Sequence, residues 1–456
     1  MTEQSEFMSG VIEGFYGEPW TQGERFELFG QMSRWGLNTY FYGPKDDLKH
    51  RAIWRECYTN PETEWLGSVI QECATHGIRF IYGIGPGLDI RYSNPVDIEL
   101  LQLRLEQLLS LGCQNFAILF DDIPDGMDAD DAKRFGSFAS AQCHVTNALL
   151  LRMRERCPQV KFCFCPTPYC GRMVAAGLGG EGYLETLGEH LDSEIEIFWT
   201  GPEIISQEIT VSHILEMQRL FRRKPLIWDN LHANDYDGRR FFCGPYSGRS
   251  PELRNLVSGI LSNPNNEFPL NYVPLCTLAM FVHNTGYWDA RAAYLAAMKD
   301  WLPQFTTLHH SIPLDDLVLL GDCYYLPQEE GFHAEALYQT VETVLDPSAD
   351  DWMVHFHHFR EQSSRLKTLC FRLTELRHRR LFYALSRRIW ELREELDFLE
   401  RYVAFLTTRK DPKELFHPEV HLAGTYRGGI VPRLQRLLNR QVDGTFQTTS
   451  PVSSVP

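Results

Sequence analysis

The sequence lacks several features that would assign it to common classes of protein. Charged residues interrupt each hydrophobic stretch of the 456-residue chain, so we expect no membrane-spanning segment. The first ten residues, MTEQSEFMSG, have neither the basic nor the apolar stretch of a secretory signal. Basic residues are also few, since 44 Lys and Arg stand against 60 Asp and Glu, a formal net charge of −16. This balance argues against a broad basic surface, and nucleic acid is therefore not an expected partner.

The twelve cysteines include no CxxC pair and no His/Cys ligand set, which argues against a zinc site and a metal hydrolase. Cys163, Cys165 and Cys170 lie closest together, but the first two belong to a run typical of a strand. Others, such as Cys73 and Cys276, lie in apolar or amphipathic segments, where a thiol behaves as a small hydrophobic group. We therefore expect all twelve to be reduced, which favours the cytoplasm.

Short apolar, β-rich runs alternate with segments of helical spacing over the first 300 residues. The runs are continuous rather than alternating, as expected for strands that are buried on both faces. Eight such strands separated by helices predict a (β/α)8 TIM barrel, with a doubly wound open sheet as the alternative. The eight runs are 10–13, 38–42, 79–83, 115–120, 160–165, 195–200, 225–228 and 274–280.

The pattern changes after about residue 300, where Pro- and Gly-containing coil gives way to helical periodicity. Leucines between 366 and 376, and a longer apolar stripe from Leu381 to Leu406, step by three or four residues. They predict an α-helical bundle domain, with a coiled-coil dimer contact as the alternative. The predicted divisions are an N-terminal tail 1–8, a catalytic barrel 9–300, a linker 301–330, a helical domain 331–442 and a disordered tail 443–456.

Polar and aromatic residues follow the predicted strands, and in a barrel these positions form the active-site rim. Asp121 and Asp122 come directly after an apolar run, where two carboxylates are costly unless they are used. Because two close carboxylates do not both ionise freely, one can serve as an acid and the other as an anion, as glycosidic chemistry requires. A helix cap or a salt-bridged pair in a loop is the alternative.

Seven motifs follow one another between residues 8 and 285. They are GVIEGFYGEPW, YGPKDDLKHR, FDDI, CPTPYCG, WTGP, IWDNLHANDYD and LSNPNNEFPLNYV. In this order they resemble glycoside hydrolase family 84. The family comprises β-N-acetylglucosaminidases, among them the protein O-GlcNAcases that remove single GlcNAc residues from Ser and Thr. The resemblance implies a (β/α)8 barrel and no metal or organic cofactor.

The resemblance also implies a retaining mechanism in which the substrate supplies the nucleophile, an exception to the two-carboxylate scheme. The 2-acetamido oxygen attacks C1 and forms an oxazoline. Asp121 matches the residue that orients and polarises the acetamido N–H, where an anion stabilises the developing positive charge. Asp122 matches the general acid, which later acts as the base and must begin protonated.

Other residues in these motifs match sugar-binding positions of the family. Gly10 and Lys45 match positions that contact the sugar hydroxyls, with Lys45 alternatively a surface lysine that balances neighbouring aspartates. Asp235 matches the carboxylate that binds O4 and O6, with Asn263 beside it. Asn230 matches the amide near the acetamido group or O3.

The aromatic residues of the motifs are expected to shape the pocket. Tyr169 matches the tyrosine that bonds the acetamido oxygen as the ring closes. Trp228 and Tyr236 are predicted to wall the pocket, with core packing and loop anchoring as their respective alternatives. Cys165 is expected at the pocket floor as a thiol that takes no part in the chemistry.

The sequence thus predicts a retaining β-N-acetylglucosaminidase that acts on O-GlcNAc-modified proteins. An exo-β-N-acetylhexosaminidase acting on small glycans or glycosaminoglycan fragments is the alternative enzyme, and its partners would be GlcNAc-terminated glycans. A sugar-binding pseudoenzyme or scaffold is a third possibility, against which the intact Asp121 and Asp122 argue. The helical domain is hypothesised to help hold the glycosylated peptide.

Overall fold

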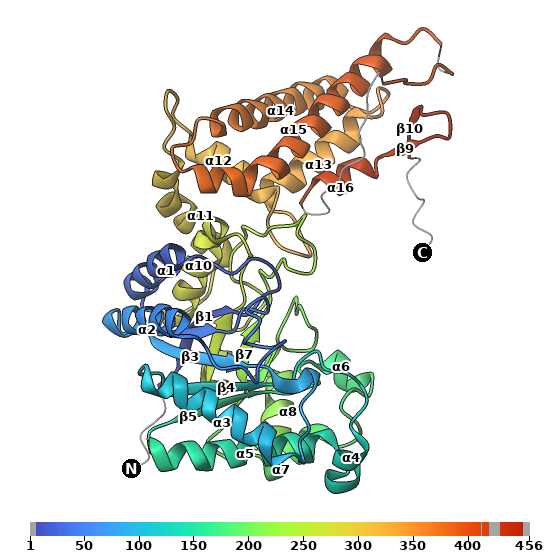
Figure 1. The fold of residues 1–456 in the computed structure, drawn as a ribbon. Helices are drawn as coiled ribbons and strands as arrows, with labels where there is room; N and C mark the ends of the chain where they lie inside the picture. Colours follow the sequence, from blue (N-terminus) through green and yellow to red (C-terminus); the bar gives the residue numbers. More distant parts are fainter. Residues whose placement is uncertain (1–5, 412, 419–428, 450–456) are drawn as a thin grey trace. The chain divides into compact units, whose positions relative to one another are not determined.

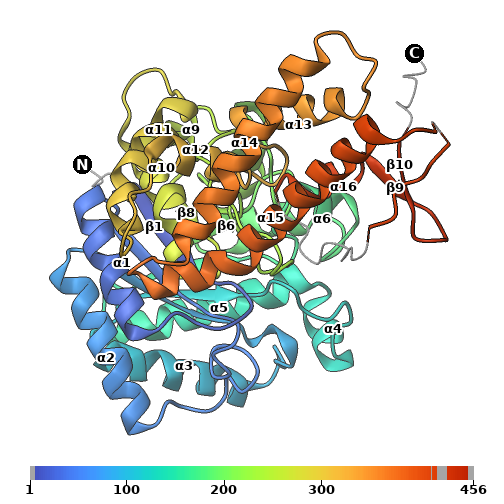
Figure 2. The same ribbon diagram turned by 90° about the horizontal axis from the view of Figure 1, so that it is seen from above.

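The structure is a computed structural model that describes residues 6–411, 413–418 and 429–449 (Figures 1 and 2). The chain divides into two compact units. The first comprises residues up to 235 together with 246–268 and 275–289. The second comprises 236–245, 269–274 and the described residues from 290 onward. This division differs from the predicted barrel 9–300, because residues 236–245, 269–274 and 290–300 belong to the second unit.

Eight parallel strands form a closed barrel in sequence order, which confirms the predicted fold class (Figure 1). Each strand pairs with its neighbours along the chain, and β1 pairs with β8 to close the ring. The strands are β1 (Met8–Glu13), β2 (Thr39–Tyr42), β3 (Arg79–Ile84), β4 (Asn115–Leu119), β5 (Lys161–Cys165), β6 (Glu196–Trp199), β7 (Leu226–Asp229) and β8 (Gly259–Ser262).

The prediction for the eighth strand is wrong. Residues 274–280 lie inside helix α10 (Tyr272–His283), and the eighth strand is the preceding four-residue segment β8. Nearly every residue of α10 is buried, so the helix has no polar face. A short apolar run of this kind has no helical periodicity and cannot be distinguished from a buried strand by its pattern alone.

Helices surround the strands of the first unit, and the first three begin at recognisable caps. Thr21 and Glu24 form a reciprocal capping box at α1, and Thr59 and Glu62 form another at α2. Asn94 caps α3, which begins with a proline. The helices are α1 (Gln22–Trp35), α2 (Asn60–Thr75), α3 (Pro95–Ser110), α4 (Ala129–Phe135), α5 (Phe138–Arg156), α6 (Gly171–Ala175), α7 (Tyr183–His190), α8 (Val211–Phe221) and α9 (Leu253–Leu256).

The barrel interior is a packed apolar core rather than a channel. Side chains alternate between the interior and the surrounding helices along each strand, so Ala117 and Leu119 of β4 point inward. Asp121, two residues further on, continues this inward side at the end of the strand. The interior cluster comprises Met8, Ile12, Phe41, Ile81, Ala117, Leu119, Cys163, Cys165, Phe198, Leu226, Trp228 and Leu261.

The second unit is mainly helical, as predicted, and α14 packs against both α13 and α15. The apolar stripe of α15 is buried from Leu381 to Leu406. The helices and strands of the second unit are α11 (Ala290–Trp301), α12 (Leu314–Asp322), α13 (Phe332–Val344), α14 (Trp352–Leu373), α15 (Arg379–Thr408), α16 (Val431–Gln435), β9 (Leu438–Arg440) and β10 (Phe446–Thr448).

Two segments that were predicted to be irregular contain regular structure. The expected linker 301–330 includes α12, whose residues Leu317 to Leu320 are all buried. The expected disordered tail includes β10, which pairs with β9 and places Phe446 against Phe398 at 4.9 Å between ring centroids. The buried ring of Phe446 anchors this hairpin. Its strands have only three residues each, too few to show a hydrophobic periodicity in the sequence. Residues 450–456 of the expected tail lie outside the described residues.

Among the described residues, no helix combines the length and the apolar character that a membrane span requires. No group of three or more His, Cys, Asp or Glu side chains in this part of the chain is arranged to hold a metal ion. The twelve cysteines are present as thiols, and all but Cys57 are buried.

Candidate active site

A buried carboxylate, Asp121, lies just after the end of β4. Lys45, from the loop after β2, places its Nζ 2.5 Å from Asp121 Oδ2. Burial alone would raise the pKa of Asp121, but the charges of Lys45 and Arg51 outweigh it and lower the pKa below its ordinary value. Asp121 is therefore an anion at neutral pH, as a group that polarises an N–H must be.

His50 is a neutral neighbour of this ion pair. Its ring is buried, and Nδ1 lies 2.8 Å from the carbonyl oxygen of Gly83. Burial and the charge of Lys45 lower its pKa to about 4. The imidazole therefore adds no second positive charge beside Asp121 at neutral pH, and Lys45 remains the cation in direct contact with that carboxylate.

Asp122 has a different environment from Asp121. Its side chain is exposed, and two phenol groups bind its two oxygens. The Tyr169 hydroxyl donates to Oδ1 and the Tyr16 hydroxyl donates to Oδ2, both at 3.1 Å. Burial and then the charge of Asp122 raise the pKa of each tyrosine, so both hydroxyls stay protonated. The adjacent carboxylates therefore have distinct surroundings, which suits distinct roles in acid–base chemistry.

An amide cluster follows β7 and β8. Asn230 Oδ1 accepts from Trp228 Nε1 at 3.1 Å and from Asn263 Nδ2 at 2.9 Å, while Asn230 Nδ2 donates to the carbonyl of Ile204 at 2.8 Å. Asn263 Oδ1 is buried and has no hydrogen-bond partner within the part of the chain that the structure describes. Buried polar atoms are normally satisfied, so this oxygen is a candidate acceptor for a sugar hydroxyl.

The loop after β1 is tied to the loops after β7 and β8. The backbone N–H of Tyr16 donates to Asp235 Oδ2 at 3.0 Å, and Asn266 Nδ2 donates to the carbonyl of Tyr16 at 2.6 Å. These bonds hold Tyr16 and Asp235 on the same part of the rim.

Gly10 and Trp228 belong to the barrel wall and its interior. A Cβ at Gly10 would lie 1.7 Å from the carbonyl oxygen of Thr39, so the strands approach each other too closely there for any side chain. Trp228 is 7% exposed and packs on Phe41 and Phe198 at 5.5 and 5.3 Å between ring centroids. Trp228 therefore packs in the barrel interior and donates to Asn230, and its role as a pocket wall stays a prediction.

Cys165 and Tyr169 lie near the paired aspartates. Cys165 is buried in the barrel interior, and burial, followed by the charge of Asp121, raises the pKa of its thiol well above its ordinary value. A neutral thiol is a poor nucleophile, in line with the expected passive role. Tyr169 packs against the same interior cluster, and Thr200 holds its carbonyl through a backbone N–H at 2.9 Å.

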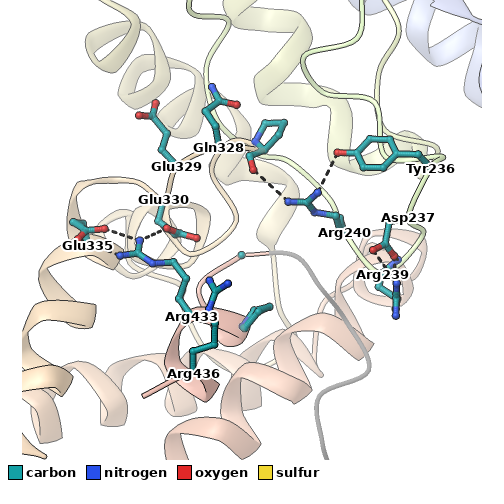
Figure 3. A pocket seen from close by; sticks show the side chains of 13 residues that line it. Tyr236, Asp237, Arg239, Arg240, Gln328, Glu329, Glu330, Glu335, Arg433 and Arg436 are labelled. Carbon is teal, nitrogen blue, oxygen red and sulfur yellow. Dashed lines mark hydrogen bonds and ion pairs between the residues drawn. The ribbon is translucent and has the colours of Figure 1, made fainter. Parts of the chain in front are cut away.

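Tyr236 belongs to the second unit, and its role as a pocket wall stays a prediction. It follows Asp235 directly in the chain and lines a cavity of about 880 Å³ within the helical unit (Figure 3). Arg240 of this cavity donates to the carbonyl of Pro327, and Arg433 pairs with Glu330 and Glu335. The cavity therefore contains charges of both signs, largely paired with one another.

All predicted site residues except Tyr236 belong to the first unit, which contains the barrel. Sequence reasoning assigned no role to Tyr16, His50 or Arg51, although each lies inside one of the seven motifs. Arg51 donates to the Tyr16 hydroxyl at 3.1 Å and to the carbonyl of Asp122 at 2.5 Å. No local pattern distinguishes such a residue from a surface arginine, because its partners lie 35 and 71 positions away.

The sequence model of the beta-N-acetylglucosaminidase family matches residues 9–310, more than half of the chain. The chain belongs to this family. The resemblance to a family of β-N-acetylglucosaminidases described above is confirmed.

Relatives of this β-N-acetylglucosaminidase family member include the protein O-GlcNAcases of Rattus norvegicus and Mus musculus. Each is 49% identical over 273 residues, which cover 60% of this chain and 30% of the relative. The chain thus spans under a third of the length of these relatives. A solved mutant of the O-GlcNAc hydrolase of Thermobaculum terrenum is 28% identical with a TM-score of 0.78, covering 88% of this chain and 86% of the other.

Replacing Lys45 by Met tests the electrostatics around Asp121. The variant keeps Asp121 buried but removes its adjacent cation, so the pKa of Asp121 should rise. The family resemblance implies that Asp121 acts as an anion. Activity should then be lost as pH falls through its pKa, and the acidic limb of the kcat/KM profile should move to higher pH in the variant. Leaving a buried charge unpaired should also lower the free energy of unfolding at pH 7 by about 3–5 kcal/mol.

Lys49→Met is the matched control for this prediction. Lys49 pairs with Glu62, which is partly exposed, so its loss should cost about 1 kcal/mol or less and leave the pH profile in place. An acidic limb that is identical in wild type and Lys45→Met would contradict the assigned link between Lys45 and Asp121.

Proposed function

We propose that the protein is a retaining hydrolase that removes O-linked GlcNAc from Ser and Thr of proteins. The observation that carries the proposal is the pair of adjacent carboxylates in two environments. Asp121 is a buried anion bound to Lys45, whereas Asp122 is exposed and bound by two phenols. One carboxylate is fixed as an anion and the other faces solvent, where it can exchange a proton.

In the proposed first step, the acetamido carbonyl oxygen of the substrate attacks C1 and the glycosidic bond breaks. Asp122 donates its proton to the departing Ser or Thr oxygen. Asp121 accepts a hydrogen bond from the acetamido N–H and stabilises the positive charge that develops on the oxazoline. The product of this step is the cyclic intermediate, and Asp122 is left as a carboxylate.

In the second step, Asp122 takes a proton from water while the water oxygen attacks C1. The C1–oxygen bond of the oxazoline breaks, and the acetamido group re-forms. Two successive inversions at C1 give GlcNAc with its original β configuration. Asp122 ends protonated, so the cycle needs no other co-reactant than water.

Protein substrates are preferred in this proposal because the relatives at 49% identity are named protein O-GlcNAcases. The second candidate, an exo-hexosaminidase for small glycans, remains because the pocket residues address only the terminal sugar. Release of GlcNAc from O-GlcNAc-modified protein should exceed release from chitobiose at equal concentration. Faster release from chitobiose would favour the second candidate.

A reducing compartment such as the cytoplasm suits the twelve thiols.

Asp235→Ala tests the proposed contact with O4 and O6 of the sugar. Loss of a charged hydrogen-bond acceptor should cost about 1.5–3 kcal/mol, roughly a 10- to 150-fold fall in kcat/KM, expressed mainly in KM. The same variant should lose little on an aryl GlcNAc that lacks both the 4- and the 6-hydroxyl, because the contact is already absent. Asp237→Ala, whose side chain pairs with Arg239, is the matched control. Equal losses of kcat/KM on both substrates would contradict the proposed contact between Asp235 and the sugar.

A further inference from the structure

The backbone of Asp122 has a conformation that L residues rarely adopt. Its φ is +48°, and among the described residues the other non-glycine residues with positive φ are Arg222 and Asp351. Such a conformation persists only where surrounding groups hold it, and it is concentrated at functional sites. A residue that holds the backbone of Asp122 would therefore also fix the direction in which its carboxyl group points.

Arg51 contacts this backbone directly. Its Nη2 donates to the carbonyl oxygen of Asp122 at 2.5 Å, and its Nη1 donates to the Tyr16 hydroxyl at 3.1 Å. The Tyr16 hydroxyl in turn donates to Oδ2 of Asp122 at 3.1 Å. Arg51 is 9% exposed, so water does not readily replace these bonds. One guanidinium thus binds Asp122 twice, once at its backbone and once through a phenol.

We propose that Arg51 is a positioning residue for proton transfer by Asp122. This inference rests on the proposed function of Asp122 as the acid and base. The planar fork of the guanidinium holds two acceptors in fixed directions, which an ammonium group cannot do. Arg51 therefore acts through geometry on Asp122. It also contributes charge near Asp121, and the two effects are separable because a lysine at this position would keep the charge without the fork.

The decisive variant is Arg51→Lys, assayed on two substrates that differ in leaving group. Hydrolysis of an O-GlcNAc peptide needs the proton from Asp122, whereas an activated aryl GlcNAc needs it far less. We expect kcat on the glycopeptide to fall about 10- to 100-fold and kcat on the aryl substrate to fall less than about threefold. In the Asp122→Asn background, Arg51→Lys should cause no further loss on the glycopeptide, because the group it positions is no longer an acid.

Tyr16→Phe provides a second, milder variant, since it deletes one oxygen from a side chain that is 45% exposed. It should show the same dependence on the leaving group, and it decides the question if Arg51→Lys does not fold. Arg55→Lys is the matched control. Arg55 lies four residues after Arg51 and binds Asp89 and Asp97. Its substitution should leave the rates on both substrates unchanged.

Three results would overturn the assignment of Arg51: unchanged rates, equal losses on both substrates, or a loss that adds to that of Asp122→Asn. Each of these is distinct from failure of the proposed function itself. If the proposed function failed, the wild-type protein would not release GlcNAc from the glycopeptide, whatever its rate on the aryl substrate. The inference about Arg51 would then be wrong as well.

Discussion

Asp122→Asn is expected to lower kcat on O-GlcNAc peptides by about 10²- to 10⁴-fold, the usual contribution of a general acid. A Ser or Thr alkoxide leaves poorly, so bond cleavage depends on the proton that Asp122 supplies. An activated aryl group leaves without it, and formation of the oxazoline from such a substrate should be nearly as fast as in wild type. The measurement is kcat/KM on both substrates, because this parameter reports the first step.

The second step should also be slowed in Asp122→Asn, because no base activates the water. Azide needs no deprotonation, and it should therefore accelerate turnover of the aryl substrate in the variant but not in wild type. The asparagine keeps the size of the side chain. Its Oδ1 can still accept from Tyr169, and its Nδ2 can donate to the oxygen of Tyr16. Equal losses of kcat/KM on both substrates, in a variant that unfolds at the wild-type urea concentration, would contradict the role of Asp122 as the acid.

Asp121→Asn is expected to have the other large effect, about 10²- to 10³-fold in kcat/KM, by analogy with removal of one electrostatic stabiliser. The loss should be equal for aryl and peptide substrates, since the acetamido oxygen bonds to C1 as either leaving group departs. In both reactions the same positive charge develops on the nitrogen. The neutral asparagine also leaves the buried ammonium of Lys45 without its counter-ion. The free energy of unfolding should therefore fall as well.

A double variant separates catalysis by Asp121 from stability. Combining Asp121→Asn with Lys45→Met removes both charges of the buried pair and should recover part of the lost stability. Activity should stay low, because the negative charge beside the acetamido nitrogen is still missing. Recovery of activity together with stability would show that Asp121 acts only through the fold.

Much of the barrel was predictable because its strands and helices have distinct hydrophobic patterns. Seven of the eight strands coincide with predicted runs, and α1 to α3 begin at recognisable caps. The eighth failed because α10 is apolar on all sides, whereas β8 has only four residues. The β9–β10 hairpin was missed for a similar reason, since a few contacts around Phe446 stabilise it rather than a periodic segment.

Candidate site residues could be predicted where the local sequence alone makes a residue unusual, but the contacts between distant loops could not. Two carboxylates directly after an apolar strand are costly unless they are used, so the sequence alone made Asp121 and Asp122 candidates for the site. The pairing of Asp121 with Lys45 and the contacts of Arg51 depend on loops that converge from distant parts of the chain. The positive φ of Asp122 is likewise set by this surrounding network, because aspartate alone does not require it.

The central claim is that the substrate's own acetamido oxygen is the nucleophile. Aryl GlcNAc substrates with zero, one, two or three fluorines on the acetyl methyl group test it most directly. Each fluorine withdraws electrons from the carbonyl oxygen and makes it a weaker nucleophile, with little change in size. We predict that kcat/KM falls steeply and progressively along the series. A kcat/KM that does not change with fluorine content would contradict the account and would indicate a nucleophile supplied by the protein or by water.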